Sequence, residues 1–370
     1  MSAVAAETDQ RVRVALVGAG VIGPIHAEVI GELADRMELV AVADHKSERA
    51  ERVAVERGGK PFSSLSEALA AVEIDVVTVC TPTGRHAEVA IEALEAGKHV
   101  IIEKPAEVTV EKTDEIIAAQ RRAGTLVAVI SQRRFDPATE VTVDAIRRGE
   151  LGRLTSGIAS IDWWRGQSYY DSGDWRGTWE LDGGGALMNQ GVHTVDLLVA
   201  TLGRPVEVTA YTATLAHDRI EVEDVAVGVV KFANGALGVL HASTAAYPGL
   251  SARLQVHGDQ GSVVIDNDEL SFIHVTTQGG RAQEKAYGSK STSVNQVADY
   301  PHASGVGAQT AGSDPGRLAV DAHRRQYENF LATLAGKEEL RVDLETNRQS
   351  IAVITAVYES ARTGRPVTLR

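Results

Sequence analysis

The chain has 370 residues, of which 44% are hydrophobic and 24% are charged. This length provides enough apolar side chains for a sizeable core and favours two domains over one. The formal net charge of −13 argues against nucleic acid and against an anionic membrane surface as the main partner, because both would repel an acidic protein.

The single cysteine and the N-terminal segment restrict where the protein works. Cys80 is the only cysteine, so no intrachain disulfide can form and a reducing compartment is expected. It ends the apolar run 76–79, which favours a buried strand residue over a nucleophile. Residues 1–11 lack the apolar stretch of a signal peptide, and no window approaches the ~20 continuous apolar residues of a membrane-spanning helix. We expect a cytoplasmic protein that does not bind membranes.

The first third of the chain alternates short apolar runs with helical patterns. Strands are predicted over 12–17, 39–43, 75–79, 99–102 and 126–130, and helices over 21–33, 46–57, 65–71, 83–96 and 110–123. Continuous apolar strands indicate burial on both faces, which is typical of a parallel sheet. Strand–helix alternation then predicts a doubly wound α/β domain over residues 1–130.

The pattern changes after about residue 131. Helices are predicted over 137–148 and 187–202, and strands over 154–164, 206–214, 226–232, 237–244, 252–257, 262–266 and 270–277. Successive strands, two of them joined by the turn Asn234-Gly235, predict an α+β domain over 131–370 with a large, mostly antiparallel open sheet. Residues 278–315 are predicted to form a long loop. Helices over 318–334 and 346–363 close the chain, the second ending at Gly364, and both are candidates for packing back on the first domain.

A glycine run separates the first predicted strand from the first predicted helix. It reads Gly18-Ala19-Gly20-Val21-Ile22-Gly23, and this strand–helix context is the one that dinucleotide binding requires. Gly18 permits a tight turn, Gly20 lets the backbone approach a pyrophosphate, and Gly23 lets helix and strand pack closely. The phosphates would bind at the helix N-terminus, beside Val21 and Ile22. The first domain is therefore predicted to be a Rossmann domain that binds a dinucleotide.

An acidic residue ends the second predicted strand. Asp44 lies 21 residues after Gly23 (44 − 23), where a carboxylate accepts hydrogen bonds from the ribose hydroxyls and repels a 2′-phosphate. This favours NAD over NADP as the cofactor. His45-Lys46 and Arg49 soften that repulsion, and a surface Asp after a glycine-rich turn is the alternative interpretation.

Glu103-Lys104-Pro105 follows the predicted strand 99–102. Ligands of open parallel sheets bind outside the carboxyl ends of the strands, so Lys104 is expected at the edge of the crevice. An ammonium there donates to a substrate hydroxyl and stabilises a developing alkoxide. Pro105 fixes the turn, and a cis bond before it is one available geometry. Read alone, a Lys that follows a strand is usually a solvated surface residue, which is the alternative for Lys104.

Together these segments resemble the Gfo/Idh/MocA family, named after glucose–fructose oxidoreductase, inositol dehydrogenase and MocA. The matching segments are 17–23 with His26, Thr81-Pro82 with His86, 96–100, 103–105, 183–193 running into 196–198, and 358–364. They span nearly the whole chain. The resemblance implies an NAD(P)-dependent oxidoreductase whose cofactor contacts include Thr81, Pro82, His86, Glu103 and Lys104. It also implies a homodimer or homotetramer formed through the open sheet.

Asn189 and His193 lie four residues apart on a predicted helix, so they are expected to share a face. The ordinary pKa of an imidazole suits proton removal from an alcohol, which makes His193 the candidate base. The family pattern commonly has Asp at the first of these positions. Asn189 departs from it, and an amide can position a hydroxyl but cannot raise the basicity of the histidine. The resemblance therefore leaves the details of the proton relay open.

All four tryptophans lie between residues 163 and 179, together with Tyr169 and Tyr170. Aromatic faces suit the C–H faces of a pyranose, and Arg165, Arg176 and Asp182 offer polar contacts. The predicted substrate contacts are Lys104, Trp164, Arg165, Trp175, Arg176, Asn189 and His193. A packed loop or a subunit interface is the alternative for this segment.

The hypothesis is an NAD-dependent dehydrogenase that transfers a hydride between nicotinamide and a hydroxyl carbon of a sugar, sugar derivative or inositol. Lys104 would hold the substrate oxygen, His193 would act as general acid/base, Asn189 would orient the substrate, and no metal is implied. Rival interpretations are a non-catalytic NAD-binding regulator, a glycoside-modifying enzyme that uses transient oxidation, and an imine or biliverdin-type reductase. His26 either contacts the cofactor or packs its helix, and Arg85 and His86 are either cofactor contacts or solvated.

Overall fold

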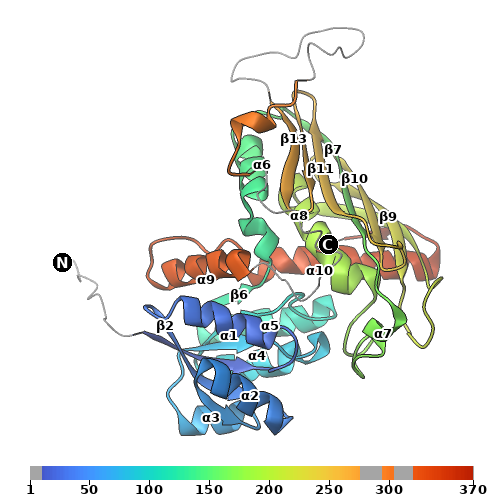
Figure 1. Cartoon of the computed structure of the whole chain (residues 1–370). Coiled ribbons are helices and arrows are strands. Elements are labelled where there is room, and N and C mark those ends of the chain that lie inside the picture. Colours follow the sequence, from blue (N-terminus) through green and yellow to red (C-terminus); the bar gives the residue numbers. More distant parts are fainter. Residues whose placement is uncertain (1–10, 276–293, 304–319, 370) are drawn as a thin grey trace, which may run out of the picture.

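The computed structural model describes residues 11–275, 294–303 and 320–369. It contains a six-stranded sheet and an eight-stranded sheet, with the C-terminal helices running between them (Figure 1). The predicted fold class is confirmed: an α/β chain with an N-terminal doubly wound parallel sheet and a C-terminal part built on a mostly antiparallel open sheet. Within the described ranges, no helix is both long enough and apolar enough to cross a membrane.

The six-stranded sheet has the order β3-β2-β1-β4-β5-β6, and all its pairings are parallel. Its strands are β1 (Val12–Val17), β2 (Met37–Ala43), β3 (Lys60–Phe62), β4 (Val76–Val79), β5 (His99–Ile102) and β6 (Val127–Val129). The order reverses between β1 and β4, and a dinucleotide binds outside the carboxyl ends of strands at such a point. Strand β3 was not predicted, because a three-residue edge strand containing Pro61 has no readable alternation.

Helices cover both faces of this sheet. They are α1 (Gly23–Glu32), α2 (Ser47–Arg57), α3 (Leu65–Ala71), the short 3-10 turn η1 (Thr83–Arg85), α4 (His86–Glu95) and α5 (Val110–Ala123). Helix α5 shows why the boundaries fall where they do: Thr109 accepts a hydrogen bond from the Lys112 N–H at its start, and Gly124 adopts a left-handed conformation at its end.

The eight-stranded sheet has the order β13-β12-β11-β7-β10-β9-β8-β14. Its strands are β7 (Leu154–Asp162), β8 (Pro205–Ala213), β9 (Val225–Phe232), β10 (Leu237–Ser243), β11 (Ala252–Gly258), β12 (Ser262–Asp266), β13 (Glu269–His274) and β14 (Val367–Thr368). Only β7 and β10 pair in parallel. The Asn234-Gly235 turn joins β9 to β10 as predicted, with Gly235 at φ 91°. The two-residue strand β14 was too short to be predicted.

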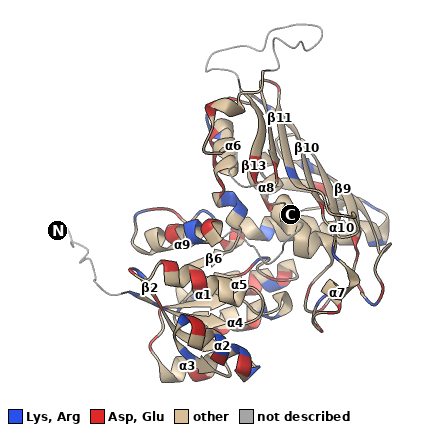
Figure 2. Cartoon of the chain, viewed as in Figure 1, with Lys and Arg blue, Asp and Glu red and all other residues tan. Residues whose placement is uncertain are grey.

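One face of the larger sheet is covered and the other is open. Helices α8 (Val192–Leu202) and α10 (Leu344–Thr363) pack on strands β7 and β8. Along β9, exposed and buried side chains alternate, as expected for a half-buried antiparallel strand. Figure 2 shows charged residues on the helices of the Rossmann sheet, whereas the long strands β9 and β10 are largely without them.

The remaining elements lie outside the two sheets. They are η2 (Gln132–Phe135), α6 (Pro137–Arg147), α7 (Gln167–Tyr170), the π-helix η3 (Ala186–Gly191), η4 (Val297–Asp299) and α9 (Val320–Leu334). Helix α9 packs on α1, and α10 packs on both α5 and α8, so the end of the chain contacts both sheets (Figure 1). The loop predicted over 278–315 lies largely outside the described residues.

Candidate active site

The glycine run forms the turn between β1 and α1. Gly18 has φ 99°, and a Cβ on it would lie 2.5 Å from the Cys80 carbonyl. A Cβ on Gly23 would lie 2.3 Å from the Gly18 oxygen, whereas a Cβ on Gly20 would meet nothing within 4 Å. The turn is therefore tight on its protein side and open at Gly20, which fits the close approach of a pyrophosphate. Val21 is exposed at the same opening, and Cys80 below it is buried, as predicted.

Asp44 is fixed beside the glycine turn. Its Oδ2 accepts the Ala19 N–H at 2.8 Å and its Oδ1 accepts the Lys46 N–H at 2.8 Å. The residue is only 7% exposed, so the alternative of a solvated surface Asp is wrong. Each carboxylate oxygen has a second acceptor position, which leaves capacity for hydroxyl donors such as those of a ribose. The His45 ring, 3.3 Å from Oδ1, is exposed.

His86 connects the turns that follow β4 and β5. Its Nε2 lies 2.9 Å from the Thr81 oxygen and its Nδ1 lies 2.9 Å from the Pro105 oxygen. The ring is buried, and burial lowers its pKa. The solvated alternative for His86 is therefore wrong, whereas Arg85 lies at the surface and pairs with Glu88 at 3.1 Å. His86 holds the Thr81-Pro82 turn against the Lys104 turn.

Lys104 reaches from the Rossmann sheet to the second sheet's helices. The Lys104–Pro105 bond is cis. The Lys104 Nζ donates to the Asn189 backbone oxygen at 3.0 Å. Burial lowers the pKa of the ammonium, while the carboxylates of Glu103 and Asp182 act in the opposite direction. The solvated-surface interpretation of Lys104 is thus wrong.

A small pocket lies between the two halves of the molecule. It is lined by Lys104, Ser131, Arg133, Val192, His193 and Asp196. Lys104 and His193, which are 89 residues apart in the sequence (193 − 104), thus line one pocket. Burial, together with the charges of Lys104 and Arg133, holds the pKa of His193 well below its usual value. The imidazole is therefore neutral near pH 7 and able to accept a proton.

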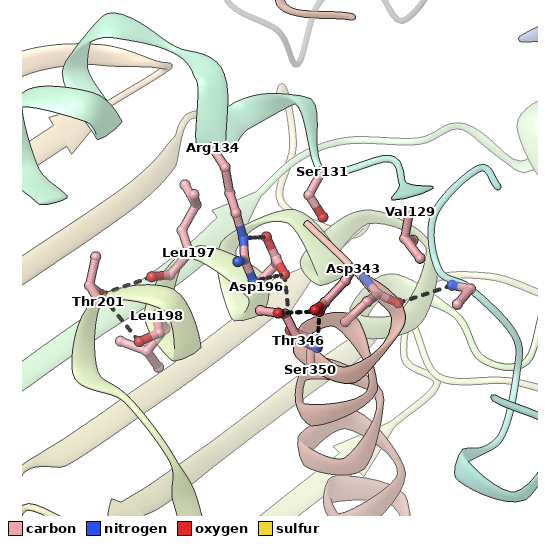
Figure 3. A network of polar contacts seen from close by, with 12 residues as sticks. Val129, Ser131, Arg134, Asp196, Leu197, Leu198, Thr201, Asp343, Thr346 and Ser350 are labelled. Atoms are coloured by element: carbon pink, nitrogen blue, oxygen red, sulfur yellow. Dashed lines mark hydrogen bonds and ion pairs between the residues drawn. The ribbon is translucent and has the colours of Figure 1, made fainter. Parts of the chain in front are cut away.

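Asp196 lines this pocket but has its own partners. Arg134 donates to both of its oxygens at 2.6 Å, and the Ser350 hydroxyl donates to Oδ1 at 3.0 Å (Figure 3). The two-pronged ion pair joins η2 to α8, and Ser350 adds α10. Asp196 therefore holds the pocket wall through these partners.

The helix predicted over 187–202 is wrong in its first turn, which is the π-helix Ala186–Gly191. A Cβ on Gly185 would lie 1.8 Å from the Glu223 backbone oxygen, and one on Gly184 would lie 2.1 Å from the Tyr358 hydroxyl. The Glu223 carboxylate accepts the N–H groups of Gly185 at 2.9 Å and Leu187 at 2.8 Å. These contacts hold the turn in its wider form, and π-turns are frequent at functional sites.

Asn189 lies on this π-turn, so its four-residue spacing to His193 does not place the two side chains on one α-helical face. The Asn189 Nδ2 donates to Asp182 at 2.5 Å, and its Oδ1 accepts from Gln190 at 2.7 Å and from Tyr169 at 3.3 Å. Burial raises the pKa of Asp182. An Asp at position 189 would face this second carboxylate, which accounts physically for the amide.

Comparison with known proteins agrees with this geometry. Residues 12–131 match an oxidoreductase family with an NAD-binding Rossmann fold, and residues 142–264 match the GFO/IDH/MocA C-terminal domain. The chain belongs to the Gfo/Idh/MocA family. It is an oxidoreductase whose N-terminal half has the NAD-binding Rossmann fold of this family.

Three relatives illustrate the range of this family. The inositol 2-dehydrogenase of Rhizobium meliloti is 31% identical over 277 residues, 73% of this chain and 80% of the relative. The D-glucoside 3-dehydrogenase of Escherichia coli is 29% identical and covers 98% of this chain and 99% of its own. The crystal structure of the WlbA dehydrogenase from Chromobacterium violaceum, in complex with NADH and UDP-GlcNAcA, has a TM-score of 0.85 at 33% identity, covering 100% of this chain and 99% of that one.

The aromatic segment of this Gfo/Idh/MocA protein packs largely on itself. The Arg176 guanidinium lies 4.2 Å from the Tyr169 ring centre and 4.5 Å from that of Trp175. Arg165 is buried and donates to Gln190 at 3.1 Å. Trp164 is half-buried and meets the Tyr247 ring at 5.4 Å. The packed-loop alternative thus describes part of the segment, while Trp164, Trp175 and Arg176 keep exposed surface for a ligand.

Sequence reasoning missed several residues of the site. Ser131 and Arg133 line the pocket from a short 3-10 turn that has no periodicity to read. Asp182 was noted only as a polar neighbour, although its place directly before the three glycines is a signal that it supports the following turn. His26 is fully buried and bonds to Tyr327 and Glu103, so of its two predicted roles the structure supports packing.

Proposed function

We propose that this protein catalyses NAD-dependent hydride transfer at a hydroxyl carbon of a sugar, sugar derivative or inositol. The observation that carries the proposal is the pocket in which Lys104 of the Rossmann half and His193 of the C-terminal half face one space. We take the domain boundary to lie between residues 130 and 131, so each domain contributes one of the two groups. Lys104, His193 and Asn189 are the proposed catalytic residues.

The chemistry of the pocket follows from the ionisation of its two groups. Bound NAD⁺ supplies the hydride acceptor. Neutral His193 removes the proton of the substrate hydroxyl, and in the reverse direction it returns that proton. The Lys104 ammonium donates a hydrogen bond to the substrate oxygen and stabilises the negative charge that develops there. Its acceptor in this structure, the Asn189 carbonyl, supports this role by aiming Nζ at the π-turn.

The cofactor is proposed to be NAD rather than NADP. Asp44 is anchored through two backbone N–H groups, so its negative charge remains at the end of β2, where a 2′-phosphate would have to lie. The proposed cofactor contacts are Gly18, Gly20, Val21, Ile22, Gly23, Asp44, Thr81, Pro82, His86, Glu103 and Lys104. Of these, Glu103 and His86 are buried and act on the site through the turns that they hold.

A pyranose or cyclitol ring is the proposed substrate. The relatives named above act on an inositol and a D-glucoside, and the WlbA dehydrogenase binds UDP-GlcNAcA. In this chain Trp164, Trp175 and Arg176 are the half-buried residues of the aromatic segment that are available to cover a sugar face. Arg165 and Asn189 complete the proposed contacts.

The test is a screen of purified protein with NAD⁺ across monosaccharides, inositols, glycosides and nucleotide sugars, followed by absorbance at the NADH band. Turnover on at least one secondary alcohol of these classes is expected. Tight NAD⁺ binding without turnover on any of them would favour the non-catalytic regulator, and release of an aglycone without net NADH would favour transient oxidation.

The open face of the larger sheet is proposed to bind a second copy of the chain. It exposes a run of apolar side chains on three adjacent strands, namely Tyr211, Val227, Val229, Leu237 and Val239. Val229 lies opposite Val239, so the patch is continuous across β9 and β10. Burying such a patch is favourable, and self-association covers it on both copies. A homodimer or homotetramer is expected in sedimentation, and a monomer would contradict this arrangement.

A further inference from the structure

A buried polar cluster lies behind the Lys104 turn and connects the Rossmann sheet to the C-terminal helix α9. Its members are His26 on α1, Thr78 on β4, Glu103 after β5, and His323 and Tyr327 on α9. All five side chains are buried, and all except Glu103 are completely so. Nothing in the sequence connects α9 with the Lys104 turn, because the two lie far apart along the chain.

The hydrogen-bond partners in this cluster indicate which nitrogen of His26 carries the proton. The Tyr327 hydroxyl lies 2.8 Å from His26 Nδ1 and 3.1 Å from Thr78 Oγ1. The His26 Nε2 lies 3.0 Å from Glu103 Oε1. A carboxylate only accepts, so His26 donates from Nε2 while its Nδ1 accepts the Tyr327 proton. Burial lowers the pKa of His26, in agreement with a neutral ring.

Glu103 remains ionised in this surrounding. Its Oε2 accepts the Lys104 backbone N–H at 2.9 Å, and the His323 Nε2 lies 3.6 Å from Oε1. Burial favours the protonated acid, but the hydrogen bond from His26 and the adjacent His323 ring outweigh it and hold the pKa of Glu103 well below its usual range. One full negative charge is therefore buried next to Lys104.

Lys104 depends on this charge. Burial lowers the pKa of its ammonium, and Glu103 is the first of the groups that oppose the effect. The other charged groups that act on it are Asp182, which favours the ammonium, and Arg133 and Arg176, which oppose it. His193 faces it across the pocket as a neutral ring. Without Glu103, two guanidinium groups would remain against one carboxylate.

We propose that Glu103, held by His26 and by His323 of α9, is a positioning residue that keeps Lys104 charged and its backbone fixed at the pocket. Tyr327 and Thr78 complete the arrangement by fixing the proton of His26. The proposal rests on the function proposed above, because Glu103 acts through Lys104 rather than by contact with substrate.

His26, Glu103 and His323 are also residue types that bind metals, and a metal site is the main alternative to our proposal. One ligand atom of each of His26, Glu103 and His323 lies within 4.8 Å of the other two. The proton assignment argues against an ion, because His26 Nε2 carries the proton that Glu103 accepts. Elemental analysis of the purified protein decides this point: a stoichiometric transition metal that is lost in His323→Leu would replace our proposal.

The direct test measures the ionisation of Lys104 without using turnover. Wild type and Glu103→Gln are acetylated competitively across a range of pH, and the Lys104 peptide is quantified by mass spectrometry, with the exposed Lys60 and Lys337 as internal references. The labelling midpoint of Lys104 is expected to fall by about one pH unit or more in Glu103→Gln, while the references stay unchanged. An unchanged Lys104 midpoint overturns the proposal.

A second set of variants separates positioning from simple stability. His323→Gln retains an N–H donor for Glu103, whereas His323→Leu removes it. Asn329→Ala serves as the matched control, because Asn329 is a buried polar residue of the same helix that bonds to Glu338, Glu339 and Arg341 instead. His323→Leu is expected to lower the Lys104 midpoint and to reduce kcat about tenfold with little change in the KM for NAD⁺. His323→Gln should restore most of both.

The control is expected to lower Tm without moving the midpoint. If His323→Leu behaves like Asn329→Ala, the cluster is purely structural and the proposal fails. If wild type oxidises no sugar, the function proposed above fails instead, and the labelling midpoints still decide the role of Glu103.

Discussion

The molecule contains two glycine-rich turns that each precede a helix at the site, and the two turns differ in the residues that enclose them. The 18–23 turn closes on Leu16 of β1 and on Cys80 and Thr81 directly after β4, and of its three glycines only Gly20 faces open space. The 183–185 turn is enclosed by Val108, Glu223 and Tyr358, which come from three distant parts of the chain. The first turn is therefore formed by contacts within the Rossmann sheet, whereas the second needs contacts from distant parts of the folded chain.

The largest effect is expected at His193, in the helix α8 that follows the second turn and the π-helix. His193→Ala removes the proposed base and should reduce kcat about 10³-fold. NADH affinity, measured by fluorescence titration, should change little, because all the proposed cofactor contacts lie in the Rossmann half. Unchanged turnover would remove His193 from the mechanism, and loss of NADH binding would indicate that the two turns are not separable.

A pair of glycine variants tests the comparison itself. Gly185→Ala places a methyl group 1.8 Å from the Glu223 backbone oxygen and should cost about 3 kcal/mol of unfolding free energy or prevent folding. Gly20→Ala meets nothing within 4 Å and should leave Tm nearly unchanged while weakening NADH binding. Denaturant unfolding and NADH titration measure the two quantities. Equal loss of stability in both variants would mean that the turns do not differ as described.

A smaller effect is expected at Asp44, which lies beside the first turn. Asp44→Ala removes a charged acceptor and also frees the Ala19 and Lys46 N–H groups. We expect the Kd for NAD⁺ to rise about tenfold and the discrimination against NADP⁺ to shrink. Isothermal titration with both cofactors measures this. A wild type that already prefers NADP⁺ would contradict the role given to Asp44.

The smallest effect is a displacement of the pH profile. His193 must be neutral to take a proton, and burial with the nearby Lys104 and Arg133 charges lowers its pKa below the usual 6.5. A lowered pKa keeps the base neutral to more acidic pH, so the acid limb of kcat/KM should lie below 6.5. Steady-state kinetics over pH test this. An acid limb above that value would require another base or a group that raises the basicity of His193.

The same contrast explains how far the sequence could be interpreted. The order of the Rossmann elements apart from β3, the tight turn at Gly18, the close packing at Gly23 and the place of Asp44 after β2 follow from contacts between neighbours in a regular pattern, and these features agree with the structure. Lys104 and His193 were identified from motifs and from the family resemblance, but only the structure shows that the two residues line one pocket. The π-turn could not be predicted, because it depends on contacts to Glu223 and Tyr358, and the spacing of apolar residues along the helix does not reveal such distant contacts. The link from Glu103 to His323 was hidden for the same reason.

Several supports of the pocket come from the last helix of the chain. Ser350 holds Asp196, and Tyr358 accepts the Met188 N–H and donates to Glu223. During synthesis the Rossmann half also waits for this end of the chain, because Tyr327 and Phe330 of α9 and Ile351 of α10 pack into its cores. The pocket wall cannot be complete until residue 358 has emerged. A nascent chain is therefore expected to gain its cofactor site and its substrate pocket together, late in synthesis.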